Sequence, residues 1–318
     1  MPEPNAMPEV YVGIDVCKDR LDVHIHPLNQ RFAVANDAGG WRSLKRKLVA
    51  HRVVRIVMEA TSKYHRAAHR SLSAAGYAVA VTNPLRSRLF AEATGQLAKT
   101  DGVDAAMLAR FAEQLAPATT IPAAVSLEEL RELTHARTAG VKDHTALRNR
   151  LGETTSAFVK AEIAEMLEAV AASNRRIDEA IAGHIANDPA LARRSELLRS
   201  IPGIGPAVAS TLIADMSEIG TMTPKQVAAL AGLAPYPRES GAKAGQRRIR
   251  AGRGATRHAL YMAALVAARF NPSLRAFYRR LVEQGKAKKV ALIAVARKLV
   301  ILANTISSEN RPWMPRTA

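Results

Sequence analysis

Cysteine and aromatic residues are scarce in this chain of 318 residues. The only cysteine, Cys17, can form neither an internal disulfide nor a zinc site made of several thiolates, which fits a reducing compartment. Aromatic side chains make up 4% of the residues, too few for the apolar face of a helix that binds a membrane surface. The opening residues lack the pattern of a signal peptide, and no uninterrupted apolar run approaches the ~18 residues of a membrane span. We therefore expect a cytoplasmic protein that is neither exported nor embedded in a membrane.

Acidic residues are also in the minority. The chain has 46 Lys and Arg against 28 Asp and Glu, which gives a formal net charge of +18 at pH 7. A positive field of this size concentrates polyanions, so nucleic acid is the expected partner. Hydrophobic residues make up 48% of the chain, enough for ordinary cores, and the length predicts about two domains.

Alternating strands and helices are predicted for residues 8–122. Three apolar segments with short turns (VYVGIDV, LDVHIHPL and RFAVAND) indicate an antiparallel meander. Two later strands, VVRIVMEA and YAVAVTNP, are separated by helix-like stretches. We expect an α/β domain with a mixed sheet.

Long helical segments are predicted for residues 123–194, where apolar residues recur at helical spacing, as at Ile163, Leu167, Val170, Ile177 and Ile181. A helical hairpin or coiled coil fits this pattern. It could pack within one chain or form the seam of a dimer, and the Ala-rich heptads favour neither. Residues 195–310 predict a second, mainly α-helical domain, followed by a loose tail.

Four carboxylates stand out in the first domain. Asp15 lies inside an apolar strand, where burying an unpaired carboxylate is costly, and Glu59 ends the apolar run VVRIVM. Asp101 and Asp104 lie three residues apart at the start of a predicted helix and therefore share one face. Each also has a simpler explanation: a turn after Asp15, and helix capping for Asp101 or Asp104.

If the four acids converge, they require divalent cations, and oxygen ligands suit Mg²⁺ or Mn²⁺. Two such ions can activate an attacking oxygen and stabilise a leaving one in phosphoryl transfer. Asp19 and Asp22 also lie near the first strand. We interpret both as solvated, because Asp19 falls in a turn and Asp22 leads a polar and apolar alternation.

The order of these acids, in GIDVCKDRLDV, VMEATSKYH and AKTDGVDAAMLA, resembles the DEDD motif of transposases of the insertion-sequence 110 family. The resemblance covers nearly the whole chain. It implies a RuvC-like domain with a ribonuclease H type sheet, in which Asp15, Glu59, Asp101 and Asp104 bind Mg²⁺.

A helix, a tight glycine turn and a second helix are predicted from SELLRSIPGIGPAVASTLIADM. In a helix-hairpin-helix element, turn amides at Gly203 and Gly205 would contact phosphate and position DNA without reading its sequence. The alternative is a plain turn between packed helices, because glycine also serves left-handed backbone geometry.

Basic residues crowd a glycine-rich stretch that follows. Arginine's planar fork suits phosphate oxygens, so we expect this stretch to bind nucleic acid. Its cationic residues are Arg238, Lys243, Arg247, Arg248, Arg250, Arg253 and Arg257.

Ser240 lies within this field, in APYPRESG. Judged alone it is an ordinary loop serine, since no His and Asp partners stand at a diagnostic spacing. The family resemblance implies that Ser240 attacks the DNA phosphate, forms a covalent phosphoserine link and exchanges strands. It further implies a homo-oligomer, a dimer or a synaptic tetramer, with active sites composed across protomers, and a structured noncoding guide RNA that pairs with donor and target DNA.

The sequence therefore predicts an RNA-guided, Mg²⁺-dependent serine recombinase that excises and inserts its own element. Two other functions stay open. One is a metal-dependent junction-resolving nuclease in which water attacks, and the other is a basic nucleic-acid-binding protein without enzymatic activity.

Overall fold

Two compact units, residues 1–123 and 124–318, make up the chain. The computed structural model describes residues 7–60, 62–95, 101–236 and 248–315, and of residues 101–103 it describes the backbone only. The expected division at residues 122 and 194 stays a prediction.

The first unit is built on a five-stranded mixed sheet with the strand order β3-β2-β1-β4-β5. Strands β1 (Glu9–Val16), β2 (Arg20–His26) and β3 (Gln30–Ala35) form an antiparallel meander. Strands β4 (Arg52–Glu59) and β5 (Val79–Thr82) continue the sheet in parallel with β1. All five predicted strands are present, and the mixed α/β class is confirmed.

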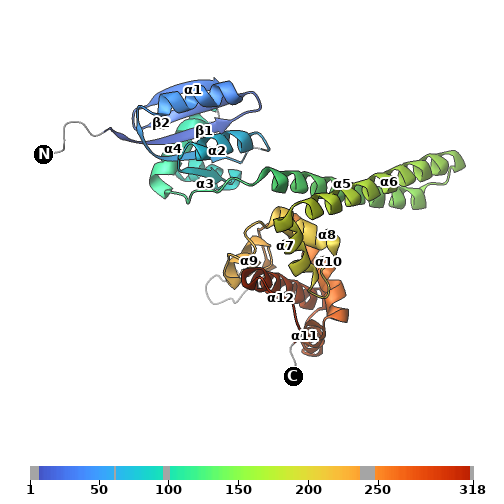
Figure 1. The fold of residues 1–318 in the computed structure, drawn as a ribbon. Helices are drawn as coiled ribbons and strands as arrows, with labels where there is room; N and C mark the ends of the chain where they lie inside the picture. Colours follow the sequence, from blue (N-terminus) through green and yellow to red (C-terminus); the bar gives the residue numbers. More distant parts are fainter. Residues whose placement is uncertain (1–6, 61, 96–100, 237–247, 316–318) are drawn as a thin grey trace. The chain divides into compact units, whose positions relative to one another are not determined.

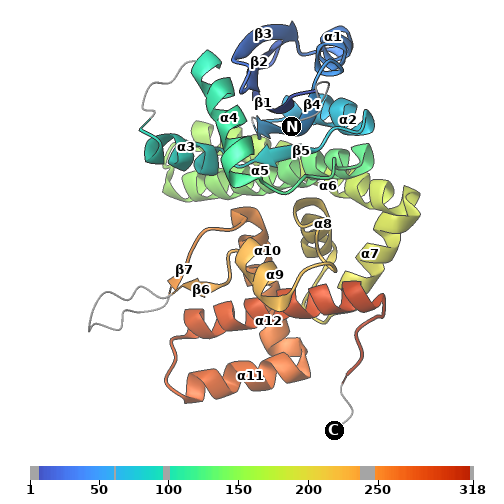
Figure 2. The same ribbon diagram turned by 90° about the vertical axis from the view of Figure 1, so that its left-hand side faces the viewer.

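Helices cover both faces of this sheet (Figure 2). One face carries α1 (Ala38–Leu48) and α2 (His65–Ala74), over a core that includes Val12, Ile14 and Met58. The other face carries α4 (Asp101–Leu115), with α3 (Pro84–Ala93) beside it. Alternation along the strands therefore divides their side chains between two hydrophobic layers.

A long antiparallel hairpin begins the second unit, formed by α5 (Val125–Glu153) and α6 (Ala157–Asn187) (Figure 1). The two helices are in close contact where Gly140 meets the buried side chain of Asn174; a Cβ at Gly140 would lie 2.1 Å from the Asn174 amide oxygen. The predicted hairpin is thus formed within one chain. Apolar surface is exposed on this hairpin at Val141, Phe158 and Met166. The predicted dimer seam stays a prediction.

The rest of the second unit is a helical bundle with one small β-ribbon. Its elements are α7 (Pro189–Arg199), α8 (Pro206–Asp215), α9 (Pro224–Leu230), β6 (Pro235–Tyr236), β7 (Arg248–Ile249), α10 (Gly254–Phe270), α11 (Pro272–Glu283) and α12 (Lys288–Glu309). By length and hydropathy α12 could cross a membrane, which the sequence reasoning did not anticipate. Half of its apolar window is buried, however, and α12 packs against α7, α9, α10 and α11. Packing in a core therefore accounts for its composition.

Candidate active site

Asp15 and Glu59 lie on neighbouring strands and on the same face of the sheet. Gly13 and Val57 are partners in the parallel pair of β1 and β4. Because side chains alternate along a strand, Asp15 shares the face of Gly13, and Glu59 shares the face of Val57. Both acids therefore lie at the carboxyl ends of adjacent parallel strands, where α/β folds place their ligand sites.

The start of α4 is directed to the same end of this face. Gly13 lies against the α4 backbone near Ala105, while Glu113, two turns further on, pairs with His26 at the opposite end of the sheet, 3.1 Å between Oε2 and Nε2. The helix thus runs antiparallel to β1, and its first turn, with the half-buried Asp104, lies toward the Asp15 end.

The side chain of Asp101 lies outside the described residues, although its place as the first residue of α4 is described. Among the side chains that are described, no three His, Cys, Asp or Glu residues are grouped closely enough to hold a metal ion. The three described acids of the predicted motif therefore share one end of one face, and a complete ligand set stays a prediction. Their chemistry, oxygen donors only, fits a hard divalent cation.

Ser87 holds the carboxylate of Glu59. Its hydroxyl donates a hydrogen bond to Glu59 Oε2 at 2.9 Å, and the carbonyl oxygen of Pro84 is an alternative acceptor at 3.0 Å. Ser87 is buried in the first half of α3, a helix capped by Asn83. Thr82, the register partner of Glu59, is also buried, and its hydroxyl has no hydrogen-bond partner among the described atoms. Neither residue was predicted, because only the strand pairing and the α3 turn bring them to Glu59.

Asp22 corrects one expectation. It was interpreted as solvated, but it lies directly opposite Asp15 in the β1 and β2 pair, and its side chain is only 17% exposed. Facing residues of an antiparallel pair share a face, so two carboxylates adjoin there. The Arg20 guanidinium offsets this repulsion, with Nε 2.8 Å from Asp22 Oδ2. Asp19 is exposed, as expected.

Asn36 fixes the loops at this end of the sheet. Its amide nitrogen donates to the carbonyl oxygens of Cys17, at 2.9 Å, and Tyr64, at 3.1 Å. Its amide oxygen accepts from Trp41 Nε1 at 3.0 Å. One side chain thereby joins the end of β1, the start of α1 and the turn before α2.

His24 is buried on β2 beneath α4. Burial, together with the positive charges of Arg31, His26 and Arg110, lowers its pKa to about 4. The imidazole is therefore neutral near neutral pH, and its Nδ1 has no hydrogen-bond partner among the described atoms.

In the second unit, the predicted helix, turn and helix are α7, residues 200–205 and α8. Gly203 has φ +112°, and a Cβ there would lie 2.6 Å from the Cβ of Ala267 on α10. A glycine is thus required at position 203 by backbone geometry and packing. Gly205 differs, because it is exposed and has open space around it.

Two of the predicted phosphate-binding arginines make contacts within the protein. Arg253 makes a bidentate ion pair with Glu218, in which its Nη1 and Nη2 each donate to one carboxylate oxygen at 2.7 Å. Burial raises the pKa of Glu218, but the hydrogen bonds and charge of Arg253 outweigh it and leave that pKa below its usual value. Arg257 donates to the carbonyl oxygens of Ala251 and Gly232.

Arg248 and Arg250, in contrast, are exposed at and just after β7. The nucleophile candidate Ser240 lies outside the described residues, together with Arg238, Lys243 and Arg247.

Family models match both units of the chain. A model described as a transposase of the DEDD, IS110 type matches residues 12–157. A second, described as the transposase IS116/IS110/IS902 family, matches residues 195–279. The chain belongs to the IS110 family of DEDD transposases. It is accordingly an enzyme of DNA transposition and recombination, and DNA is its substrate.

Relatives of this transposase include a pilin gene-inverting protein of Moraxella bovis, 29% identical over 98% of this chain and 99% of that protein. An uncharacterized 42 kDa protein of insertion element IS900 in Mycobacterium paratuberculosis is 32% identical over 39% of this chain and 32% of its own length. An uncharacterized 43.6 kDa protein of insertion element IS110 in Streptomyces coelicolor is 29% identical over 47% of this chain and 36% of its own.

Proposed function

We propose that this transposase moves its own insertion sequence by cutting and rejoining DNA with two sets of groups. Asp15, Glu59, Asp101 and Asp104 hold Mg²⁺ or Mn²⁺ in a RuvC-like, ribonuclease H type domain, and Ser240 is the nucleophile. The observation that carries the proposal is the shared position of Asp15, Glu59 and the start of α4 at one end of one sheet face.

A bound divalent cation would supply Lewis-acid polarisation of the scissile phosphate. The chain's own groups have distinct tasks. Ser87 keeps one oxygen of Glu59 engaged, so that the carboxylate is oriented before any ligand arrives. The exposed Arg248 and Arg250 offset phosphate charge near the segment that contains Ser240.

In the proposed cleavage, Ser240 Oγ forms a bond to phosphorus while the bond from phosphorus to one sugar oxygen breaks. The serine proton passes to water, and the leaving oxygen takes up a proton from water. The products are a phosphoserine ester and a free hydroxyl. Attack of a hydroxyl from another strand on the ester reverses the step and regenerates Ser240, which completes strand exchange without net hydrolysis. The printed name of the Moraxella relative, a gene-inverting protein, agrees with exchange of this kind.

Trapping the covalent intermediate tests this mechanism. Wild-type protein incubated with Mg²⁺ and labelled element-end DNA should give a labelled adduct that survives denaturation, and Ser240→Ala should give none. A junction-resolving nuclease, in which water attacks, would cleave the DNA without an adduct. Cleavage by Ser240→Ala at the wild-type rate would therefore refute the serine mechanism.

Substituting the acids separates the enzyme from a purely architectural binding protein. Asp15→Asn and Asp104→Asn should abolish strand transfer but largely preserve DNA affinity, because phosphate contacts by cations supply that affinity. Asp19→Asn is the matched control, since Asp19 is exposed on the same stretch of chain. Strand transfer that survives both substitutions would show that the metal-site assignment is wrong.

Two partners complete the proposal: a structured noncoding guide RNA encoded by the element, and further copies of this chain. The net charge of +18 suits binding of RNA as well as DNA, and base pairing would then select sequence. The apolar side chains of Val141, Phe158 and Met166, exposed on the α5 and α6 hairpin, suit a contact between protomers. Sequencing of RNA that copurifies with the protein, and the mass of the purified particle in solution, test these two points.

A further inference from the structure

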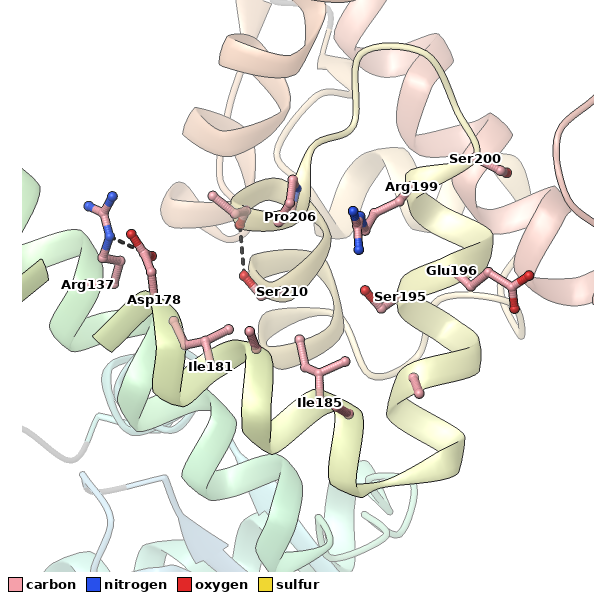
Figure 3. A pocket seen from close by; sticks show the side chains of 14 residues that line it. Arg137, Asp178, Ile181, Ile185, Ser195, Glu196, Arg199, Ser200, Pro206 and Ser210 are labelled. Atoms are coloured by element: carbon pink, nitrogen blue, oxygen red, sulfur yellow. Dashed lines mark hydrogen bonds and ion pairs between the residues drawn. The ribbon is translucent and has the colours of Figure 1, made fainter. Parts of the chain in front are cut away.

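A pocket of about 850 Å³ lies within the second unit, and its lining residues include none of the proposed metal ligands (Figure 3). Its floor is apolar and consists of Ile181, Ala182, Ile185 and Ala186 of α6. Its walls come from α5, α7 and the start of α8, and they combine charged and hydroxyl side chains with Ala192, Pro206 and Ala207. The volume falls in the range of small-ligand sites, and it exceeds what a lone inorganic anion needs.

The charges around this pocket leave one cation unneutralised. Arg137 is paired with Asp178, at 2.8 Å between Nε and Oδ1. Glu196 points away from the pocket in Figure 3 and pairs with Arg193, at 2.8 Å. Arg199 points inward, and no ion pair joins it to an acid in the described parts of the chain. The pocket is therefore biased toward an anion.

Ser195 supports the same conclusion independently. It lies one turn before Arg199 on α7, is 6% exposed, and points into the pocket. Its hydroxyl makes no hydrogen bond to any residue that the structure describes. A buried hydroxyl without a partner loses the free energy of a hydrogen bond unless a ligand or water supplies one.

Across the pocket from these two side chains is the start of α8, which is ten residues long. Its N-cap is Gly205, which has no side chain to cap the helix, and Pro206 follows it. The next amides, of Ala207 and Val208, are the first-turn donors that a helix leaves unsatisfied, and the helix dipole favours an anion there.

We propose that this pocket binds one nucleotide unit of the nucleic-acid backbone. The phosphate would contact Arg199, the Ser195 hydroxyl and the first amides of α8, and the sugar and base would lie over Ile181 and Ile185. The ligand chemistry is a phosphodiester, which DNA and RNA share. Such a contact would anchor the strand without reading its sequence.

Three substitutions in the full-length protein test this site. Arg199→Ala removes the cation, Ser195→Ala removes the hydroxyl, and Ala207→Asp places a negative charge at the second position of α8. The last is the most informative, because Ala207 is exposed and an acid in the first turn stabilises a helix while repelling a phosphate. Arg176→Ala is the matched control, since Arg176 is exposed on α6 and does not line the pocket.

Binding is measured by fluorescence anisotropy with labelled DNA and RNA oligonucleotides over a range of salt concentrations. Arg199→Ala should weaken binding about tenfold and reduce the salt slope by about one, as loss of a phosphate contact requires. Ala207→Asp should weaken binding at least as much with an unchanged or higher melting temperature, and Ser195→Ala should weaken it about threefold. Arg176→Ala should change it less than about twofold.

A deficit confined to DNA, or confined to RNA, would identify the strand that occupies the pocket, and equal deficits would indicate a site for both. If Arg199→Ala and Ala207→Asp bind DNA and RNA as Arg176→Ala does, the pocket is not a nucleotide site. Because binding is measured without Mg²⁺ and without cleavage, this result is independent of the mechanism proposed for Ser240.

Discussion

The contact between Gly13 and α4 allows us to predict how far a substitution at Gly13 destabilises the first unit. A Cβ at position 13 would lie 2.0 Å from the Ala105 carbonyl oxygen and 2.4 Å from the Ala109 amide nitrogen. Both are backbone atoms, which cannot rotate away as a side chain could, and the nearer is more than an ångström inside ordinary contact. Gly13→Ala must therefore push α4 off the sheet, and we expect it to cost about 3 kcal/mol of unfolding free energy, the upper part of the range for overpacking.

Thermal and urea unfolding followed by circular dichroism measure this effect. A loss of about 3 kcal/mol should lower the melting temperature of the first unit by about 10 °C. Gly183→Ala is the control, because position 183 is helical with open space around it and alanine should there stabilise the chain by up to about 1 kcal/mol. Because α4 carries Asp104, DNA cleavage by Gly13→Ala should fall even well below its melting temperature. Melting within 1 °C of wild type would refute the described packing of α4 on β1.

Three further predictions concern single contacts. Ser87→Ala should raise the Mg²⁺ concentration for half-maximal cleavage about tenfold, with activity restored at saturating Mg²⁺, and superimposable Mg²⁺ curves would count against its role. His24 is neutral in the folded protein and takes up a proton more readily in the unfolded chain. The unfolding free energy should therefore fall by about 3 kcal/mol as the pH is lowered from 6.5 toward 4, as measured by urea unfolding at each pH, and this fall should be smaller in His24→Phe. Arg253→Ala should lower the unfolding free energy by only about 1–2 kcal/mol, because the side chains of Arg253 and Glu218 are each over one-third exposed, and it should leave DNA affinity nearly unchanged. Arg250→Ala should weaken DNA binding and leave the unfolding free energy nearly unchanged.

The sheet could be predicted because its signals are local. Alternation of apolar residues located all five strands, and the short turns indicated the antiparallel meander. The neighbouring positions of Asp15 and Glu59 followed from the rule that parallel strands present their carboxyl ends at one edge.

Contacts between distant segments could not be predicted. Asp22 was misjudged because its burial depends on the strand register and on α4 above it, whereas the alternation around it suggested a solvated side. The packing of Gly203 against Ala267, 64 positions away in the chain, is brought about only by the fold, and a phosphate contact at Gly203 stays a prediction. The ion pair of Arg253 with Glu218 is a similar case, since the neighbouring sequence does not tell whether an arginine makes its bidentate contact with a carboxylate or with a phosphate.

The hydrogen bond from Trp41 to Asn36 has a practical consequence. The chain contains two tryptophans, and the second, Trp313, belongs to the other unit, where its backbone amide donates to Ser200. Each unit therefore has one tryptophan. In a Trp313→Phe background, tryptophan emission comes from Trp41 alone, and it reports directly on the loops at the end of the sheet where Asp15 and Glu59 lie.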